Sequence, residues 1–119
     1  MVDVLDYIKS DIKTVNTGMA ASMGSILLGA GTKGKRSSLR FSTTMLHQSS
    51  GGFSGNIQDA AIDWKEWIKV NDVLFGLLGE YCGKDPEQVK KDAERDLWLD
   101  ANQALEYGII DFIVKNNKK

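Results

Sequence analysis

The sequence has one cysteine, one histidine, almost no net charge and no long hydrophobic run. Because Cys82 has no second cysteine to pair with, an intrachain disulfide is excluded, which is typical of proteins from a reducing compartment. A formal net charge of −1 argues against a nucleic-acid-binding protein, since such proteins normally carry a basic face.

Segments that would place the chain in or across a membrane are also missing from the sequence. The longest weakly polar run, from Met19 to Gly31, is too short and too rich in glycine to cross a bilayer. The N-terminus has no basic segment followed by an apolar core, so no secretory signal is expected. We therefore expect a cytoplasmic protein without a membrane attachment.

The 119 residues suit a single domain, which we expect to span residues 1–119. Predicted helices alternate with short β-branched or apolar strands, so the expected fold class is α/β. The predicted strands are residues 13–17, 42–47, 97–99 and 109–114, and the predicted helices are residues 3–9, one starting near Ser22 or Met23, 56–81, 86 to about 96, and 101–107, with a polar tail at 115–119.

The strongest helix signal covers residues 56–81, where two apolar stripes run side by side. A surface helix needs only one stripe. Two stripes predict either a helix central to the core of this chain or a helix that packs on its own core and also on a partner. The first stripe is Ile57, Ala61, Trp64, Ile68, Asn71, Phe75 and Leu78, interrupted only by Asn71, and the second is Trp67, Val70, Leu74, Leu77 and Tyr81.

Ser22 lies in the segment G-M-A-A-S-M-G at 18–24, where a strand is expected to turn into a helix. A nucleophilic serine needs a sharp turn and a nearby base. A helix that starts after Ser22 directs free N–H groups, including that of Met23, toward a developing oxyanion. The same small residues are common where a helix packs closely on a sheet, and Ala20 departs from the G-x-S-x-G motif, so both interpretations stay open.

His47 is the single histidine and therefore the one imidazole that could serve Ser22 as a base. A lone histidine at a strand end can equally be structural. The carboxylate that would orient the imidazole is left open by spacing, although Asp96 stands at a predicted boundary between a helix and a strand. A Ser22–Lys33 pair is a further alternative, with Lys33 in a polar turn. The possible carboxylates are Asp59, Asp63, Asp92, Asp96, Asp100 and Asp111.

Four segments resemble, in the same order, the proteolytic subunits of ATP-dependent Clp proteases. They are G-M-A-A-S-M-G at 18–24, G-T-K-G-K-R at 31–36, M-L-H-Q at 45–48 and D-A-E-R-D-L-W-L at 92–99. The separations are also similar, with 25 residues from Ser22 to His47 (47 − 22) and 49 from His47 to Asp96 (96 − 47). The resemblance implies that Ser22 is the nucleophile, His47 the base and Asp96 the acid that orients it.

The resemblance further implies an α/β fold of the ClpP/crotonase type, built of stacked β-α units with residues 56–81 as a protruding handle helix. It implies a serine endopeptidase that cleaves unfolded polypeptides, with the Met23 N–H in the oxyanion hole and Ser50, Gly51 and Gly52 paired with the substrate backbone. The implied partners are further copies of the chain in stacked seven-membered rings and an AAA+ unfoldase such as ClpX, ClpA or ClpC, which uses the ATP. This chain itself is expected to bind no metal or other cofactor.

Two departures from the family keep other functions open. Ser49 follows His47-Gln48 where the family usually has a proline, which loosens the turn. The family's front part, which carries a second oxyanion donor and one wall of the substrate groove, is not recognised in these residues. A catalytically weak or inactive assembly subunit is therefore the alternative, and a crotonase-fold enzyme that acts on acyl thioesters is a more distant one.

Overall fold

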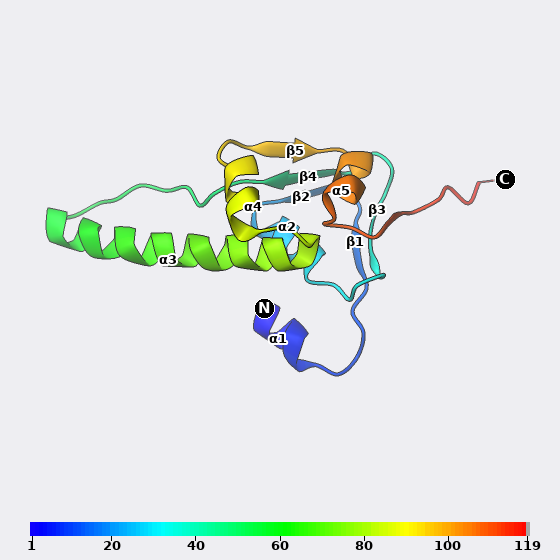
Figure 1. Ribbon diagram of the computed structural model, residues 1–119, viewed down its shortest axis with the longest axis horizontal. Helices are drawn as coiled ribbons and strands as arrows, with labels where there is room; N and C mark the ends of the chain where they lie inside the picture. The colour runs from blue at the N-terminus through cyan, green and yellow to red at the C-terminus, as the bar shows by residue number, and fades with distance from the viewer. Residues whose placement is uncertain (119) are drawn as a thin grey trace.

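Two three-stranded sheets form the body of the molecule in the computed structural model, which describes residues 1–118 (Figure 1). Lys119, the last residue of the predicted polar tail, lies outside the described residues. The first sheet has the order β1-β3-β6 and is parallel, with β1 at Thr14–Asn16, β3 at Arg36–Ser38 and β6 at Phe112–Ile113. The second has the order β2-β4-β5, with β2 (Met19–Ala21) parallel and β5 (Leu97–Leu99) antiparallel to β4 (Thr43–Leu46).

Residues 1–118 also form five helices, and local signals in the sequence set several of their ends. Asp85 caps the helix that starts at Pro86, and Asp100 forms a capping box with Gln103. Gly83 and Gly108 follow helix ends with positive φ angles of 65° and 97°, which glycine adopts without strain. The helices are α1 at Val2–Tyr7, α2 at Met23–Gly29, α3 at Ile57–Cys82, α4 at Pro86–Asp92 and α5 at Ala101–Tyr107.

The predicted α/β class is confirmed, with local corrections. Helix α1 covers Val2–Tyr7 instead of 3–9, and the last strand covers Phe112–Ile113 instead of 109–114. Helix α4 ends at Asp92 instead of about Asp96, because the chain must turn there for β5 to pair with β4. Residues 19–21 form a strand where the sequence indicated only a tight turn. Strand β3 was not predicted, because its sequence R-S-S is polar although all three residues are buried.

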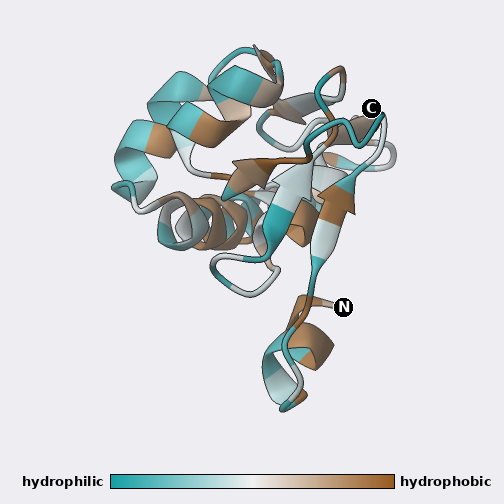
Figure 2. Cartoon of the chain, turned by 90° about the vertical axis from the view of Figure 1, so that its right-hand side faces the viewer, coloured by the Kyte–Doolittle hydropathy of each residue, from teal (hydrophilic) through white to brown (hydrophobic). Residues whose placement is uncertain are grey.

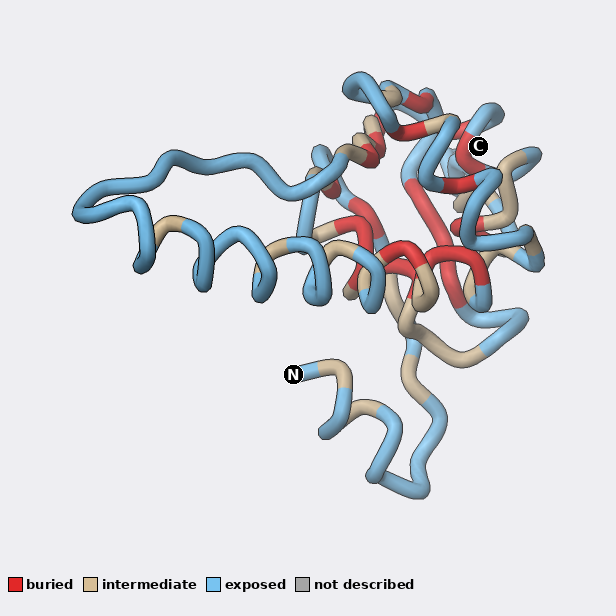
Figure 3. Tube along the Cα trace, turned by 60° about the vertical axis from the view of Figure 1, so that its left-hand side comes forward, coloured by how far each residue is buried: buried red, intermediate tan, exposed pale blue. Residues whose placement is uncertain are grey.

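Helix α3 protrudes from the body for much of its length (Figures 1 and 3). Phe75 and Leu78, near its C-terminal end, are buried in the core, whereas Trp64 and Ile68, farther out, are about half exposed. The broad apolar face predicted from the sequence is therefore only partly covered by this chain. Among residues 1–118, none of the helices is both long and apolar enough to cross a membrane.

Helix α1 lies apart from the body, to which residues 8–13 connect it (Figure 2). It has no buried residue. Val4 and Tyr7 are largely exposed, while Val2 packs against the edge of the core. Asp3 in the first turn suits the positive end of the helix, but six residues form too short a helix to be stable without packing. The position of α1 therefore depends on few contacts within this chain.

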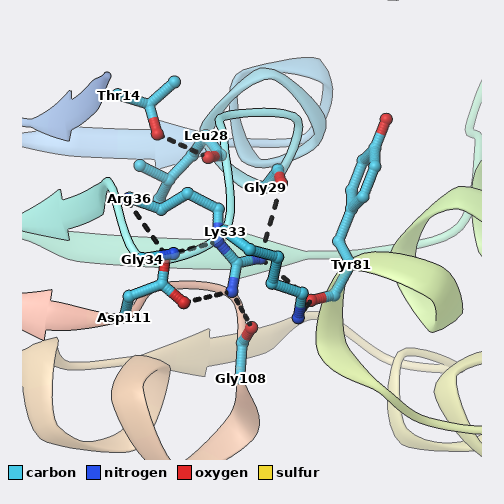
Figure 4. A network of polar contacts seen from close by, with 9 residues as sticks. All are labelled: Thr14, Leu28, Gly29, Lys33, Gly34, Arg36, Tyr81, Gly108 and Asp111. Carbon is cyan, nitrogen blue, oxygen red and sulfur yellow. Dashed lines mark hydrogen bonds and ion pairs between the residues drawn. The ribbon is translucent and has the colours of Figure 1, made fainter. Parts of the chain in front are cut away.

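Arg36 of β3 is buried, and its guanidinium donates hydrogen bonds to carbonyl groups at the C-terminal ends of three helices (Figure 4). It donates to the carbonyl oxygens of Gly29 in α2 at 3.4 Å, Tyr81 in α3 at 2.9 Å and Gly108 after α5 at 3.1 Å. Its charge is neutralised by Asp111, whose two carboxylate oxygens lie 2.7 and 2.9 Å from Nη2 and Nε. One buried cation thus satisfies carbonyl groups that helix ends leave without partners.

We expect Arg36→Ala to destabilise the protein by about 3–5 kcal/mol, because the half-buried Asp111 carboxylate and the helix-end carbonyls lose their buried partner. Lys35→Ala is the matched control. Lys35 pairs with Asp11 at the surface, so its loss should cost at most about 1 kcal/mol. Denaturant unfolding of both variants measures the difference, and equal effects would contradict the structural role of Arg36.

The same pair should make stability depend on acid pH. Hydrogen bonds from Arg36 lower the pKa of Asp111 from 3.8 to about 2. Because the folded carboxyl stays charged at lower pH than the unfolded one, its contribution is complete above the ordinary pKa and is lost as the pH falls from 3.8 toward about 2. Urea unfolding across this range should show that loss, and Asp111→Asn should flatten the pH dependence. An unchanged slope in Asp111→Asn would assign the acid sensitivity to other groups.

Candidate active site

Ser22 occupies the single residue between β2 and α2, and its backbone is strained. Its φ of 56° and ψ of −119° make it the one non-glycine residue with a positive φ among residues 1–118. Such a conformation costs on the order of 1–3 kcal/mol and persists only where neighbours hold it. The Ser22 N–H donates to the Met45 carbonyl of β4 at 3.1 Å, and the Ser22 carbonyl accepts from the Ser25 N–H at 3.0 Å. Both flanking elements therefore fix the turn that presents Ser22.

A pocket of about 250 Å³ lies beside this turn and brings several predicted residues together. Ser22, Met23 and His47 all line it, with Ser49 and Ser50 from the segment after β4. Mostly apolar residues of α2 and α3 form the rest of the wall, so the pocket combines a few polar groups with a largely apolar lining, as small-molecule and peptide sites do. The remaining lining residues are Ser25, Ile26, Val70, Asn71, Leu74, Phe75 and Leu78.

His47 directly follows β4, and its Nδ1 lies 3.8 Å from Oδ1 of Asp96. This distance is too long for a hydrogen bond, and the Asp96 side chain is 61% exposed. The strand β5 begins one residue after Asp96 and pairs with β4, which places the two side chains on adjacent strand ends. The Asp96 carboxylate therefore lies near the His47 imidazole, but the two groups do not form a hydrogen bond.

Several other carboxylates that the sequence left open are engaged elsewhere. Asp111 binds Arg36, Asp92 accepts a hydrogen bond from the Tyr107 hydroxyl at 3.0 Å, and Asp100 caps α5. Asp59 and Asp63 lie on the exposed outer part of α3.

The Ser22–Lys33 alternative also finds no support in the geometry. The Lys33 ammonium donates to the Tyr81 carbonyl at 2.8 Å, beside the Arg36 network (Figure 4). Lys33 does not line the Ser22 pocket.

Residues 48–55 form an extended segment, here called the strap, that leads from β4 outward along α3 to its N-terminal end (Figure 1). The strap includes Ser50, Gly51 and Gly52, which are exposed. Gly51 lies so close to Trp67 of α3 that an added Cβ would stand 1.6 Å from the indole ring. Phe53 also packs on the Trp67 ring, with 5.1 Å between ring centroids. A glycine is therefore required at position 51 by close packing.

The sequence reasoning missed one residue of this region, Asn71 of α3. Its Oδ1 accepts a hydrogen bond from the Ser49 N–H of the strap at 2.9 Å, and it lines the Ser22 pocket. Two signals could have found it: Asn71 is the polar interruption in an apolar stripe, and residue 49 is a serine, which unlike proline carries an N–H.

Two groups outside the pocket, Cys82 and Tyr107, have raised pKa values. Burial raises the pKa of the Cys82 thiol to about 11, so Cys82 stays protonated near neutral pH and is a poor nucleophile. Burial also raises the pKa of the Tyr107 phenol, which donates to Asp92. Within the part of the chain that the structure describes, no three His, Cys, Asp or Glu side chains are grouped closely enough to hold a metal ion.

Comparison with known proteins places the chain in a family. The family model described as Clp protease matches residues 1–117. An ATP-dependent Clp protease proteolytic subunit of Porphyromonas gingivalis is 48% identical over 117 residues, which cover 98% of this chain and 53% of that protein. The subunit of the same name from Streptococcus uberis is 45% identical over 120 residues, covering 99% of this chain and 61% of that protein.

The chain thus spans between half and two thirds of the length of these relatives. The segments around Ser22, His47 and Asp96 all fall inside the matched residues. A match over nearly the whole sequence, together with these identities, shows that the chain belongs to the Clp protease family.

Proposed function

We propose that this chain is part of a serine endopeptidase that cleaves unfolded polypeptides to short peptides in the cytoplasm. The observation that carries the proposal is the strained Ser22 turn, which opens on a pocket shared with the sole histidine. A serine on a sharp turn between a strand and a helix is the usual way to present a nucleophile. The names of the two relatives, both proteolytic subunits, support the same reaction class.

In this reaction the Ser22 hydroxyl attacks the carbonyl carbon of a peptide bond while His47 takes its proton. His47 then gives the proton to the leaving amine, and water hydrolyses the acyl-enzyme in a second step with the same base. The Met23 N–H, at the start of α2, donates to the oxyanion. Asp96 holds the imidazole in the required tautomer once the 3.8 Å gap closes on substrate binding.

The strap provides the substrate backbone with a place to bind. Ser50 lines the pocket, and Gly51 and Gly52 continue outward with exposed backbone. Pairing of an extended substrate with this backbone would be independent of side chains, which suits a protease with broad specificity. No step of this mechanism uses a metal or an organic cofactor.

The alternative is a catalytically weak or inactive assembly subunit. One observation favours it: Asp96 is exposed and lies 3.8 Å from His47. The family resemblance adds that a second oxyanion donor belongs to a part of the family that is not recognised in these residues. Loss of a single oxyanion donor costs about 2.7–4 kcal/mol of transition-state stabilisation. The two functions differ in peptide turnover and share the geometry around Ser22.

We expect a fluorophosphonate probe to label Ser22 in the assembled protein. Ser22→Ala should abolish labelling, and His47→Ala should slow it by several orders of magnitude. Ser10→Ala, which removes an exposed serine outside the pocket, should change nothing. Labelling is read by intact-mass spectrometry and peptide mapping. Labelling of a different serine would refute the proposed nucleophile, whereas labelling of Ser22 without peptide turnover would establish the alternative.

We further propose that copies of the chain assemble through α3 into stacked seven-membered rings, and that an AAA+ unfoldase such as ClpX, ClpA or ClpC feeds them at the expense of ATP. The support is the apolar surface that the outer part of α3 exposes, since large exposed apolar patches usually mark interfaces. Its exposed apolar residues include Ile57, Ile62, Trp64, Ile68, Val70 and Val73.

Sedimentation velocity should therefore detect an oligomer at micromolar concentration. Ile62→Glu combined with Trp64→Glu should dissociate it, because two carboxylates would be buried without partners. Lys65→Glu, which changes an exposed charged residue of the same helix, is the control and should leave a measurable oligomer. A stable monomer of the unaltered protein would count against assembly through α3.

A further inference from the structure

The strap is held to the rest of the chain at the two residues that directly follow His47. The Gln48 side chain donates to the Glu94 carbonyl at 3.2 Å, two residues before Asp96. The next residue, Ser49, donates its backbone N–H to Asn71 Oδ1 at 2.9 Å. His47 is thus followed by two anchored residues, of which one is fixed to the loop that carries Asp96 and the other to α3.

Asn71 lies at the boundary between two pockets. It lines the 250 Å³ pocket with Ser22 and His47, and also a neighbouring pocket of about 190 Å³ with Trp64 and Trp67. Asparagine is less favourable than leucine in the interior of a helix, and this position belongs to an otherwise apolar stripe. The hydrogen bond to the Ser49 N–H gives a physical reason for a polar residue at this point.

We propose that Asn71 is a positioning residue for the His47 base, an inference that rests on the proposed peptidase function. Nδ1 of His47 is 3.8 Å from the Asp96 carboxylate, and a hydrogen bond needs about 2.7–3.2 Å. A strap movement of less than about 1 Å therefore decides whether the imidazole is oriented. Asn71 limits that movement by fixing the residue two positions after His47 to the rigid helix α3.

The role proposed for Asn71 depends on which residue stands at position 49. A serine at this position has an N–H that can donate to Asn71, as it does here, and a φ angle that no ring restricts. A proline would have neither, because its ring fixes φ and removes the N–H. Ser49 and Asn71 therefore act as a pair, and the effects of replacing them should not add.

The test compares Asn71→Leu, Ser49→Pro and the double variant with the unaltered protein. Asn102→Leu, at an exposed asparagine of α5, is the matched control. Two readouts are followed in each protein: the rate at which a fluorophosphonate labels Ser22, and the NMR signal of the imidazole at fixed pH. His47 is the sole histidine, so that signal needs no assignment.

We expect Asn71→Leu to slow labelling by on the order of ten- to a hundredfold and to shift the imidazole signal, because the base is misplaced. The double variant should recover most of the rate, since proline restrains the strap without needing an acceptor. Asn102→Leu should match the unaltered protein in both readouts. Should Asn71→Leu fail to fold by circular dichroism, Asn71→Ala removes the same acceptor without adding volume and is read in its place.

Labelling and an imidazole signal that both stay unchanged in Asn71→Leu would overturn the inference, as would a shifted signal with normal labelling. Additive effects in the double variant would overturn the coupling to Ser49. A complete lack of Ser22 labelling in the unaltered protein would instead refute the peptidase function. The imidazole signal alone would then test the placement of His47 by Asn71, and an unchanged signal in Asn71→Leu would refute it.

Discussion

The body of this protein depends on one buried positive charge. The Arg36 guanidinium lies where α2, α3 and α5 end, and it satisfies carbonyl groups at all three C-termini while Asp111 neutralises it. Helix C-termini carry partial negative charge, so three of them can converge only where a cation is present. The position of α3 relative to α2 follows from this convergence, and with it the wall of the pocket beside Ser22.

The pocket in turn combines a rigid part and a loosely held part. The Ser22 turn is strained but fixed on both sides by backbone hydrogen bonds to β4 and within α2. His47 and Asp96, by contrast, stand at strand ends that lead into exposed segments, and their side chains are 3.8 Å apart. The nucleophile is therefore preorganised by the fold itself, whereas the alignment of the base depends on how the strap is held.

Much of this architecture could be predicted from the sequence, and the parts that could not have physical causes. The two apolar stripes predicted α3 to within one residue at each end, and Asp85-Pro86 and Asp100 marked the starts of α4 and α5. Strand β3 escaped prediction because its burial depends on a partner 75 residues away, which no local pattern reveals. The proximity of Ser22 and His47 was expected from a family resemblance, while the contact between Asn71 and Ser49 depends on tertiary structure alone.

The link between Arg36 and Asp111 also has a consequence for folding during synthesis. The two residues are 75 positions apart in the sequence. During synthesis the cation at the centre of the body therefore has no carboxylate to neutralise it until 75 further residues are made. An isolated buried charge is strongly unfavourable, so the nascent chain cannot settle into its final packing on the ribosome before Asp111 emerges. Folding of this body thereby has to wait until both members of the pair have been synthesised.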